Sequence, residues 1–210
     1  MAFKPVWSIA EVGQVEGGSS MYALPEGYSI TEASIGDIPA IVDVDKAASQ
    51  LFAPTGLLRP EALNDHVPLD VLTVEIPEKN VFVMRDETDT AVGFFLIRPR
   101  GTGLYLDQIS VHPDHGQRGL GSALMLCVIE QAEERRLPHV SLSTFRDLPW
   151  NGPFYASLGF KELPRDKYEP YMFEIEEAQQ PLMDVTKRCF MRRRVRRPLF
   201  RFKKPVPARL

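Results

Sequence analysis

Cysteine and long apolar runs are scarce in this 210-residue chain. The two cysteines, Cys127 and Cys189, are too few for the disulfide framework of a small secreted domain. No apolar run reaches the roughly 18 residues that a membrane-spanning helix needs. Residues 1–20, MAFKPVWSIAEVGQVEGGSS, lack the apolar centre of a secretory signal. These absences favour a cytoplasmic protein with buried free thiols and no membrane span; a disulfide or a catalytic cysteine is the alternative for the thiols.

What is present is the composition of an ordinary globular protein, 44% hydrophobic and 25% charged. The net charge of −3 conceals a strong asymmetry. Residues 181–210 hold 11 Lys or Arg and one acid, whereas residues 1–180 hold 14 basic and 27 acidic residues. The field of the acidic part would attract a cationic amine.

The basic end of the chain has two interpretations. The arginines of residues 188–195 fit a last strand whose side chains pair with acids of the main body, followed by a solvated or docked tail. The alternative is a tail that contacts nucleic acid or an anionic membrane, because Phe200 and Phe202 alternate with basic residues. We favour the first interpretation.

The length predicts one domain with extensions. Residues 1–27 show weak periodicity and contain the flexible EGGSS, so we expect an N-terminal extension there. The domain is expected over residues 28–195, and a basic C-terminal tail over residues 196–210.

Hydrophobic periodicity predicts alternating strands and helices within the domain. Strands are expected at residues 28–34, 80–86, 91–99, 104–111, 139–145, 160–163 and 188–195, and helices at 35–49, 120–136 and 151–158. Residues 50–78 are expected as a proline-rich loop with a short helix near 61–66, and residues 165–186 as an insertion. This order predicts an α/β (α+β) fold, a mixed, mostly antiparallel sheet of about seven strands flanked by helices.

Three glycines stand where a predicted strand passes into a predicted helix, at Gly116, Gly119 and Gly121. Glycine has the largest backbone entropy to lose, so such a cluster indicates a sharp turn or a ligand close to the backbone. The spacing G-x-x-G-x-G does not fit the dinucleotide fingerprint, and Ser122-Ala123 after the last glycine does not fit a Walker A loop.

The helix that begins near Leu120 offers a third way to hold a phosphate. Its N-terminus carries unpaired N–H groups and the positive end of the helix dipole, which favour a pyrophosphate. Arg118 would add a charge-assisted contact. A tight turn before a core helix is the alternative.

The stretch LDQISVHPDHGQRGLGSALM, residues 106–125, resembles the central motif of the GNAT-type N-acetyltransferase superfamily. That motif runs strand, V-x-P, x-x-(Q/R)-x-x-G-x-(G/A), helix, and four residues match it: Val111, Pro113, Gly119 and Gly121. The sequence departs from the motif at Gly116, where the family has Gln or Arg, and Gln117 follows it instead.

A second stretch, LPWNGPFYASLGF at residues 148–160, resembles the family's C-terminal motif through Asn151, Tyr155, Gly159 and Phe160. The two motifs occur in the family's order with a strand between them. The resemblance covers about residues 28–195. It implies the GNAT-type fold and an acetyl-CoA-dependent N-acyltransferase that moves an acetyl group directly to an amine, without a metal.

The resemblance implies roles for particular residues. Tyr155 is implied as the acid that protonates the CoA thiolate, and Asp107 as the general base; a packed core tyrosine and a substrate-binding acid are the alternatives. Alternation along the strand is expected to place Tyr105, Asp107, Ile109 and Val111 on one face. The implied acetyl-CoA-binding residues are Ile109, Ser110, Val111, Gly116, Gln117, Arg118, Gly119, Leu120, Gly121, Ser122, Thr144, Asn151 and Phe154.

Other features carry less information. His112 and His115 lack further ligands at suitable spacing, so no metal site is expected. Met125 and Met191 are expected as core residues. The alternative to an enzyme is a non-catalytic module that binds acyl-CoA and regulates, and the oligomeric state stays open, with a homodimer among the alternatives. Segments 50–78 and 165–186 are expected to shape the acceptor pocket, and the acceptor itself is not predicted.

Overall fold

The computed structural model describes residues 24–195. The basic tail and nearly all of the predicted N-terminal extension therefore lie outside the described residues, and the domain boundaries stay predictions. The strands are β1 Ser29–Glu32, β2 Val81–Arg85, β3 Ala91–Arg100, β4 Gly103–Val111, β5 His139–Phe145, β6 Lys161–Glu162 and β7 Arg188–Arg194. The α-helices are α1 Ile38–Ser49, α2 Leu69–Glu75, α3 Leu120–Glu134, α4 Gly152–Ser157 and α5 Pro170–Gln179.

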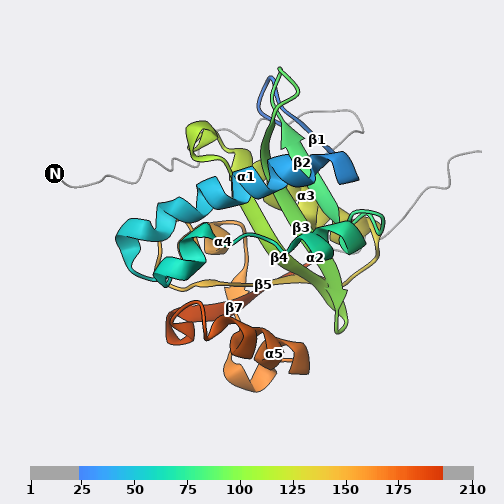
Figure 1. The fold of residues 1–210 in the computed structure, drawn as a ribbon. Helices are drawn as coiled ribbons and strands as arrows, with labels where there is room; N and C mark the ends of the chain where they lie inside the picture. Colours follow the sequence, from blue (N-terminus) through green and yellow to red (C-terminus); the bar gives the residue numbers. More distant parts are fainter. Residues whose placement is uncertain (1–23, 196–210) are drawn as a thin grey trace, which may run out of the picture.

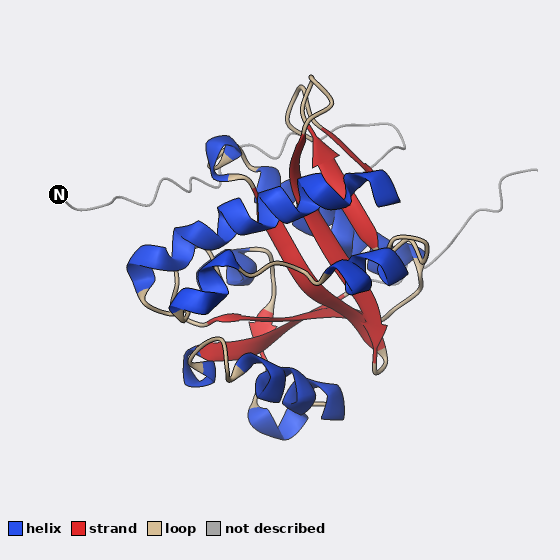
Figure 2. Ribbon diagram, viewed as in Figure 1, coloured by secondary structure: helices blue, strands red, loops and turns tan. Residues whose placement is uncertain are grey.

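The strands form one seven-stranded sheet in the order β1-β2-β3-β4-β5-β7-β6. β4 and β5 pair in parallel, and the other neighbouring strands pair antiparallel. The predicted mixed, mostly antiparallel sheet of about seven strands is thus confirmed. β5 and β7 run at a steep angle to β2, β3 and β4 (Figures 1 and 2).

Two neighbouring residues of β3 pack on opposite faces of the sheet, into two different parts of the core. Phe94 packs into a cluster with α1 and α2, whereas Phe95 packs into a cluster with α3 and α4. Both phenylalanines are fully buried, as strand alternation requires for a sheet covered on both faces. α1 lies across one face of the sheet and α3 across the other (Figure 1).

Two of the helices were not predicted. α2 follows Pro68 in the segment expected as a proline-rich loop, and α5 begins at Pro170 in the segment expected as an insertion. A proline at the start of a helix costs no backbone hydrogen bond. Each helix is short and buries few side chains, Leu72 in α2 and Tyr171 and Met172 in α5, so its periodicity is weak.

The prediction that four residues of β4 share one face is wrong (Tyr105, Asp107, Ile109 and Val111). The register between β3 and β4 shifts between Leu96 and Ile97, so that Asp107 is an extra residue of β4. Such a bulge reverses the alternation of the residues that follow it. Tyr105 therefore packs against α5, whereas Ile109 and Val111 pack against the α3 cluster.

The face of β7 that carries Arg188 and Arg192 is partly covered by α5. Phe190, which lies on that face, is 1% exposed because α5 covers it. The expected pairing of the strand's arginines with acids is confirmed for Arg192, which forms an ion pair with Glu169. Met125 and Met191 are core residues, as predicted.

Candidate active site

β4 and β5 separate part-way along their length. Their parallel pairing joins Leu104–Leu106 to Val140–Leu142 and stops there. His112 N–H donates to the Val92 carbonyl of β3 at 2.8 Å. Because successive backbone groups of a strand point to opposite sides, the N–H groups of Ile109 and Val111 point toward β5, which has moved away. This edge of β4 is therefore open to another extended chain.

The glycine loop after β4 ends at a helix N-terminus. Gly119 is the N-cap of α3 with φ +78°, and a Cβ built on it would meet no atom within 4 Å. The cap makes no side-chain hydrogen bond, so the first-turn N–H groups of α3 are uncapped. Gln117 also lies in the left-handed region, with φ 60°. Leu120, 1% exposed, fixes the helix start in the core.

Arg118 lies at the rim of this loop. Its Nη1 donates to the Tyr28 hydroxyl at 2.9 Å and its Nη2 donates to the Asp114 carbonyl at 3.3 Å. The Tyr28 oxygen also lies 3.2 Å from His115 Nδ1. The first residues of the domain thus hold the arginine beside the helix N-terminus.

The start of α4 lies against the end of β5 and the first turn of α3. A Cβ on Gly152 would lie 2.1 Å from the Arg146 carbonyl oxygen, so no side chain fits there. A Cβ on Gly121 would lie 3.7 Å from Phe154 Cζ, which places the phenylalanine ring over the first turn of α3. The two sequence motifs therefore meet in space.

Two buried oxygens in this region have no hydrogen-bond partner within the described part of the chain. They are Thr144 Oγ1 on β5 and Asn151 Oδ1 at the start of α4. Thr144 is 2% exposed and, by alternation, shares the face of Leu142 and the α3 cluster. Native proteins rarely leave buried polar atoms unpaired. Both residues were predicted to contact acetyl-CoA, and both offer acceptors to a ligand.

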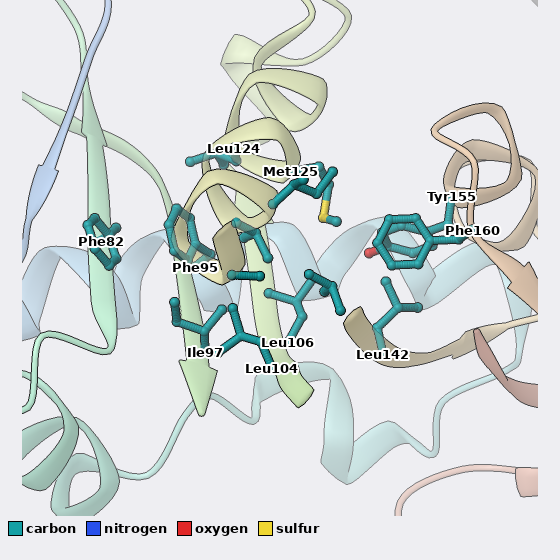
Figure 3. Close-up of a cluster of buried hydrophobic side chains, with 14 of the residues drawn as sticks. Phe82, Phe95, Ile97, Leu104, Leu106, Leu124, Met125, Leu142, Tyr155 and Phe160 are labelled. Atoms are coloured by element: carbon teal, nitrogen blue, oxygen red, sulfur yellow. The ribbon is translucent and has the colours of Figure 1, made fainter. Parts of the chain in front are cut away.

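Tyr155 extends from α4 into the α3 cluster and is 7% exposed. Its ring contacts Phe154 and Phe160, with centroids 5.1 Å and 5.9 Å away. The hydroxyl end of the ring points away from α4, toward the side chains that β4 and α3 contribute (Figure 3). Burial raises the pKa of Tyr155 to about 12, against the opposing effect of the Arg188 cation. The phenol is therefore protonated at neutral pH.

Asp107 forms a two-point ion pair with Arg98, which the sequence did not reveal. Arg98 Nε donates to Asp107 Oδ2 at 2.9 Å, and Nη2 bonds the other oxygen. Burial raises the pKa of Asp107 from its usual value, and the hydrogen bond and charge of Arg98 oppose that rise. The only sequence signal was a single cation in the apolar strand AVGFFLIRP.

A second buried carboxylate, Asp45 on α1, was missed. It is 2% exposed and accepts hydrogen bonds from Gln108 Nε2 at 2.6 Å and from Ser110 Oγ at 2.8 Å. The Val67 N–H donates to its other oxygen at 2.9 Å. Burial raises the pKa of Asp45. An acid beside the core residues Ile41 and Val44 was the signal that could have revealed it.

Neither thiol is placed for chemistry. Cys127 and Cys189 are free, and burial raises their pKa values to about 12 and about 11, so both are thiols at neutral pH. Within residues 24–195 no group of three or more His, Cys, Asp or Glu side chains is arranged to hold a metal ion. None of the helices in that range has the length and apolar character of a membrane span.

The two segments expected to shape the acceptor pocket meet. Leu58 forms a β-bridge with Met183, and Arg59 N–H donates to the Leu182 carbonyl at 2.9 Å. Between residues 56–60 and 180–185 lies a groove of about 660 Å³.

Residues 51–160, which contain both motifs, match the model of the acetyltransferase (GNAT) family. The chain belongs to this family. The GNAT-type fold predicted from the motifs is confirmed by solved structures. These include the PaiA N-acetyltransferase of Thermoplasma acidophilum in complex with coenzyme A, at TM-score 0.63 and 15% identity over 80% of this chain and 98% of that one.

Two further solved structures have a similar fold. The ribosomal-protein-S18-alanine N-acetyltransferase of Escherichia coli matches at TM-score 0.58 and 17% identity over 83% of this chain and 99% of that one. N-acetylglutamate synthase of Neisseria gonorrhoeae, in complex with coenzyme A and N-acetyl-glutamate, matches at TM-score 0.62 and 17% identity. That match covers 81% of this chain and 35% of the synthase, so this GNAT protein spans about a third of its length.

Proposed function

We propose that this GNAT protein moves the acetyl group of acetyl-CoA directly to a primary amine. The observation that carries the proposal is the opening between β4 and β5, with the unpaired oxygens of Thr144 and Asn151 in the same region. It lies next to the uncapped N-terminus of α3. An extended chain with amide groups and a pyrophosphate would satisfy all three features.

The residues fit coenzyme A along its length. We assign the pantetheine arm to the backbone of Ile109, Ser110 and Val111, and to Thr144 and Asn151. The pyrophosphate is assigned to the N–H groups of residues 116–122 and to Arg118, because helix N-termini favour anions. Phe154, over the first turn of α3, would pack beside the arm.

The chemistry needs a base and an acid. An alkylamine has a pKa near 10.4, so a group of the enzyme must take its proton before it attacks the thioester carbonyl. A C–N bond forms and the C–S bond breaks. The CoA sulfur, with a thiol pKa of about 8.5, then takes one proton. We assign that proton to Tyr155, which burial keeps protonated.

Asp107 is our candidate base because it lies directly after the last β4 residue that pairs with β5. Its pKa is raised by burial, which makes it a better base than an exposed aspartate. Arg98 holds both carboxylate oxygens and would orient them. Asp45 is less suited to contact an amine, because three neutral donors bind it and it is 2% exposed.

We further propose that the protein acts in the cytoplasm, which the two free thiols support.

The test is acetyl-CoA binding by calorimetry, followed by thiol release against a panel of amines. The variant Tyr155→Phe should keep acetyl-CoA binding and lose about 100-fold or more in turnover, the range for a general acid. Tyr168→Phe, in the α5 cluster, is the matched control and should keep both. Failure to bind acetyl-CoA would refute the proposal. Binding without thiol release from any amine would favour a regulatory module that binds acyl-CoA.

A further inference from the structure

Arg188, the first residue of β7, reaches across β5. Its Nε donates to Ser143 Oγ at 3.1 Å and its Nη2 donates to the Ser143 carbonyl at 2.8 Å. The guanidinium carbon lies 4.8 Å from the centroid of the Phe145 ring. Ser143 follows the last β5 residue that pairs with β4, so the guanidinium lies where the two strands separate.

The charge of Arg188 is not balanced by a carboxylate within residues 24–195. Three other arginines pair with an acid, Arg98 with Asp107, Arg146 with Glu162 and Arg192 with Glu169. Arg193, on the other face of β7, donates to the Leu158 carbonyl at 2.8 Å. Arg188 instead binds a neutral serine, and its Nη1 has no acceptor in the described part of the chain. A half-buried cation held only by neutral groups is costly, and an anionic partner would offset that cost.

The side of the sheet on which Arg188 lies is opposite the assigned cofactor side. Cys189 packs into the α3 cluster with Tyr155, whereas Phe190 packs against α5. Alternation therefore places Arg188 on the α5 side. Its charge still acts on the hydroxyls of both Tyr105 and Tyr155, lowering both pKa values against the effect of burial. The cation therefore lies on the α5 face of the sheet, opposite the assigned cofactor side and at the point where β4 and β5 separate.

An aromatic wall adjoins the guanidinium. Phe52, in the 3-10 helix Gln50–Thr55 after α1, has its ring centroid 5.7 Å from that of Phe145, and the Trp150 ring centroid lies 6.4 Å from that of Phe52. Trp150 is 44% exposed, so this wall reaches the surface.

We propose that Arg188 binds a carboxylate of the acceptor, so that the acceptor class is an amino carboxylate such as a free amino acid. The proposal rests on the proposed acetyl transfer and deepens it. The carboxylate would lie on the free Nη1 edge of Arg188, the aliphatic part against Phe145, and the amine would face the thioester. A neutral carbonyl would leave the cation unbalanced, whereas a carboxylate accepts charge-assisted bonds from the guanidinium.

The experiment measures thiol release by the full chain with acetyl-CoA and each standard amino acid, against the amide of the same amino acid. At least one amino acid should exceed its amide in kcat/KM by about 10-fold or more, since a hydrogen bond to a charged group contributes roughly 10- to 150-fold. Arg188→Gln should remove that preference, chiefly through KM, and leave the acetyl-CoA affinity unchanged. Arg188→Lys, which keeps the charge without the planar fork, should fall between the two.

Arg194→Gln is the matched control, because it removes the same charge from the exposed end of β7. Thermal unfolding shows whether each variant is folded. Amides used as well as amino acids, or an equal loss on both in Arg188→Gln, would overturn the carboxylate site while acetyl transfer stands. No thiol release from any amine would instead refute the acetyl transfer on which the site rests.

Discussion

Replacing Thr144 with valine should stabilise the protein and weaken its binding of acetyl-CoA. Thr144 is 2% exposed, and its Oγ1 has no hydrogen-bond partner within residues 24–195. Valine has nearly the same shape, so it fills the same space without the buried hydroxyl. If the Thr144 hydroxyl binds the cofactor, it stays buried and unpaired in the free protein, which lowers the stability of that form.

The two effects have magnitudes that can be measured. Leaving a buried polar group unpaired costs about 1–3 kcal/mol, so Thr144→Val should raise the free energy of unfolding by about 1 kcal/mol or more. For a domain of this size that corresponds to about 2–4 °C in Tm. Loss of one hydrogen bond to the cofactor, about 0.5–1.5 kcal/mol, should raise the Kd for acetyl-CoA by roughly 2- to 10-fold.

Ser141→Ala on the same strand is the control. Ser141 is fully buried, but its Oγ accepts a hydrogen bond from Arg192 Nε at 2.9 Å. Removing the Ser141 hydroxyl should lower Tm and leave the acetyl-CoA affinity unchanged. Thr144→Val should do the opposite on both measurements. Thermal unfolding and calorimetry of the two variants decide the matter. A lower Tm and an unchanged Kd in Thr144→Val would refute the reasoning.

Three further predictions concern Gly152, Tyr155 and Asp45. Gly152→Ala should destabilise the fold by about 3 kcal/mol in chemical denaturation, because the methyl group would lie 2.1 Å from the Arg146 carbonyl; a loss below about 1 kcal/mol would be inconsistent with that contact. Since the pKa of Tyr155 is about 12, kcat should not decline through its ionisation below about pH 10; a decline there that Tyr155→Phe abolishes would contradict its role as acid. The pKa of Asp45 is raised in the folded state, so the folded protein holds that proton more tightly and loses stability as pH rises above about 4. Asp45→Asn should flatten the stability profile from there to neutrality, and an unchanged slope would count against the raised pKa.

The sequence by itself determined the sheet, the glycine loop and the two motifs. The short apolar runs of β2, β3 and β5 and the apolar face of α3 are local patterns that the sequence shows directly. Gly119 reflects a local demand as well, a left-handed φ at the start of a helix. These signals lie within a few residues of one another, so they could be read without the fold.

Only the tertiary structure decided which polar and charged partners the site residues have. The bulge at Asp107 depends on the register with β3, and the partner of that carboxylate, Arg98, lies on the neighbouring strand. Asp45 meets Ser110 across 65 residues of chain, and Arg188 meets Ser143 across 45. Such contacts depend on which strands and helices become neighbours, and a cation without an acid can be recognised only once every neighbour is in place. The sequence therefore specified the backbone that we assign to coenzyme A, and the packing of distant segments specified the charges around the proposed acceptor site.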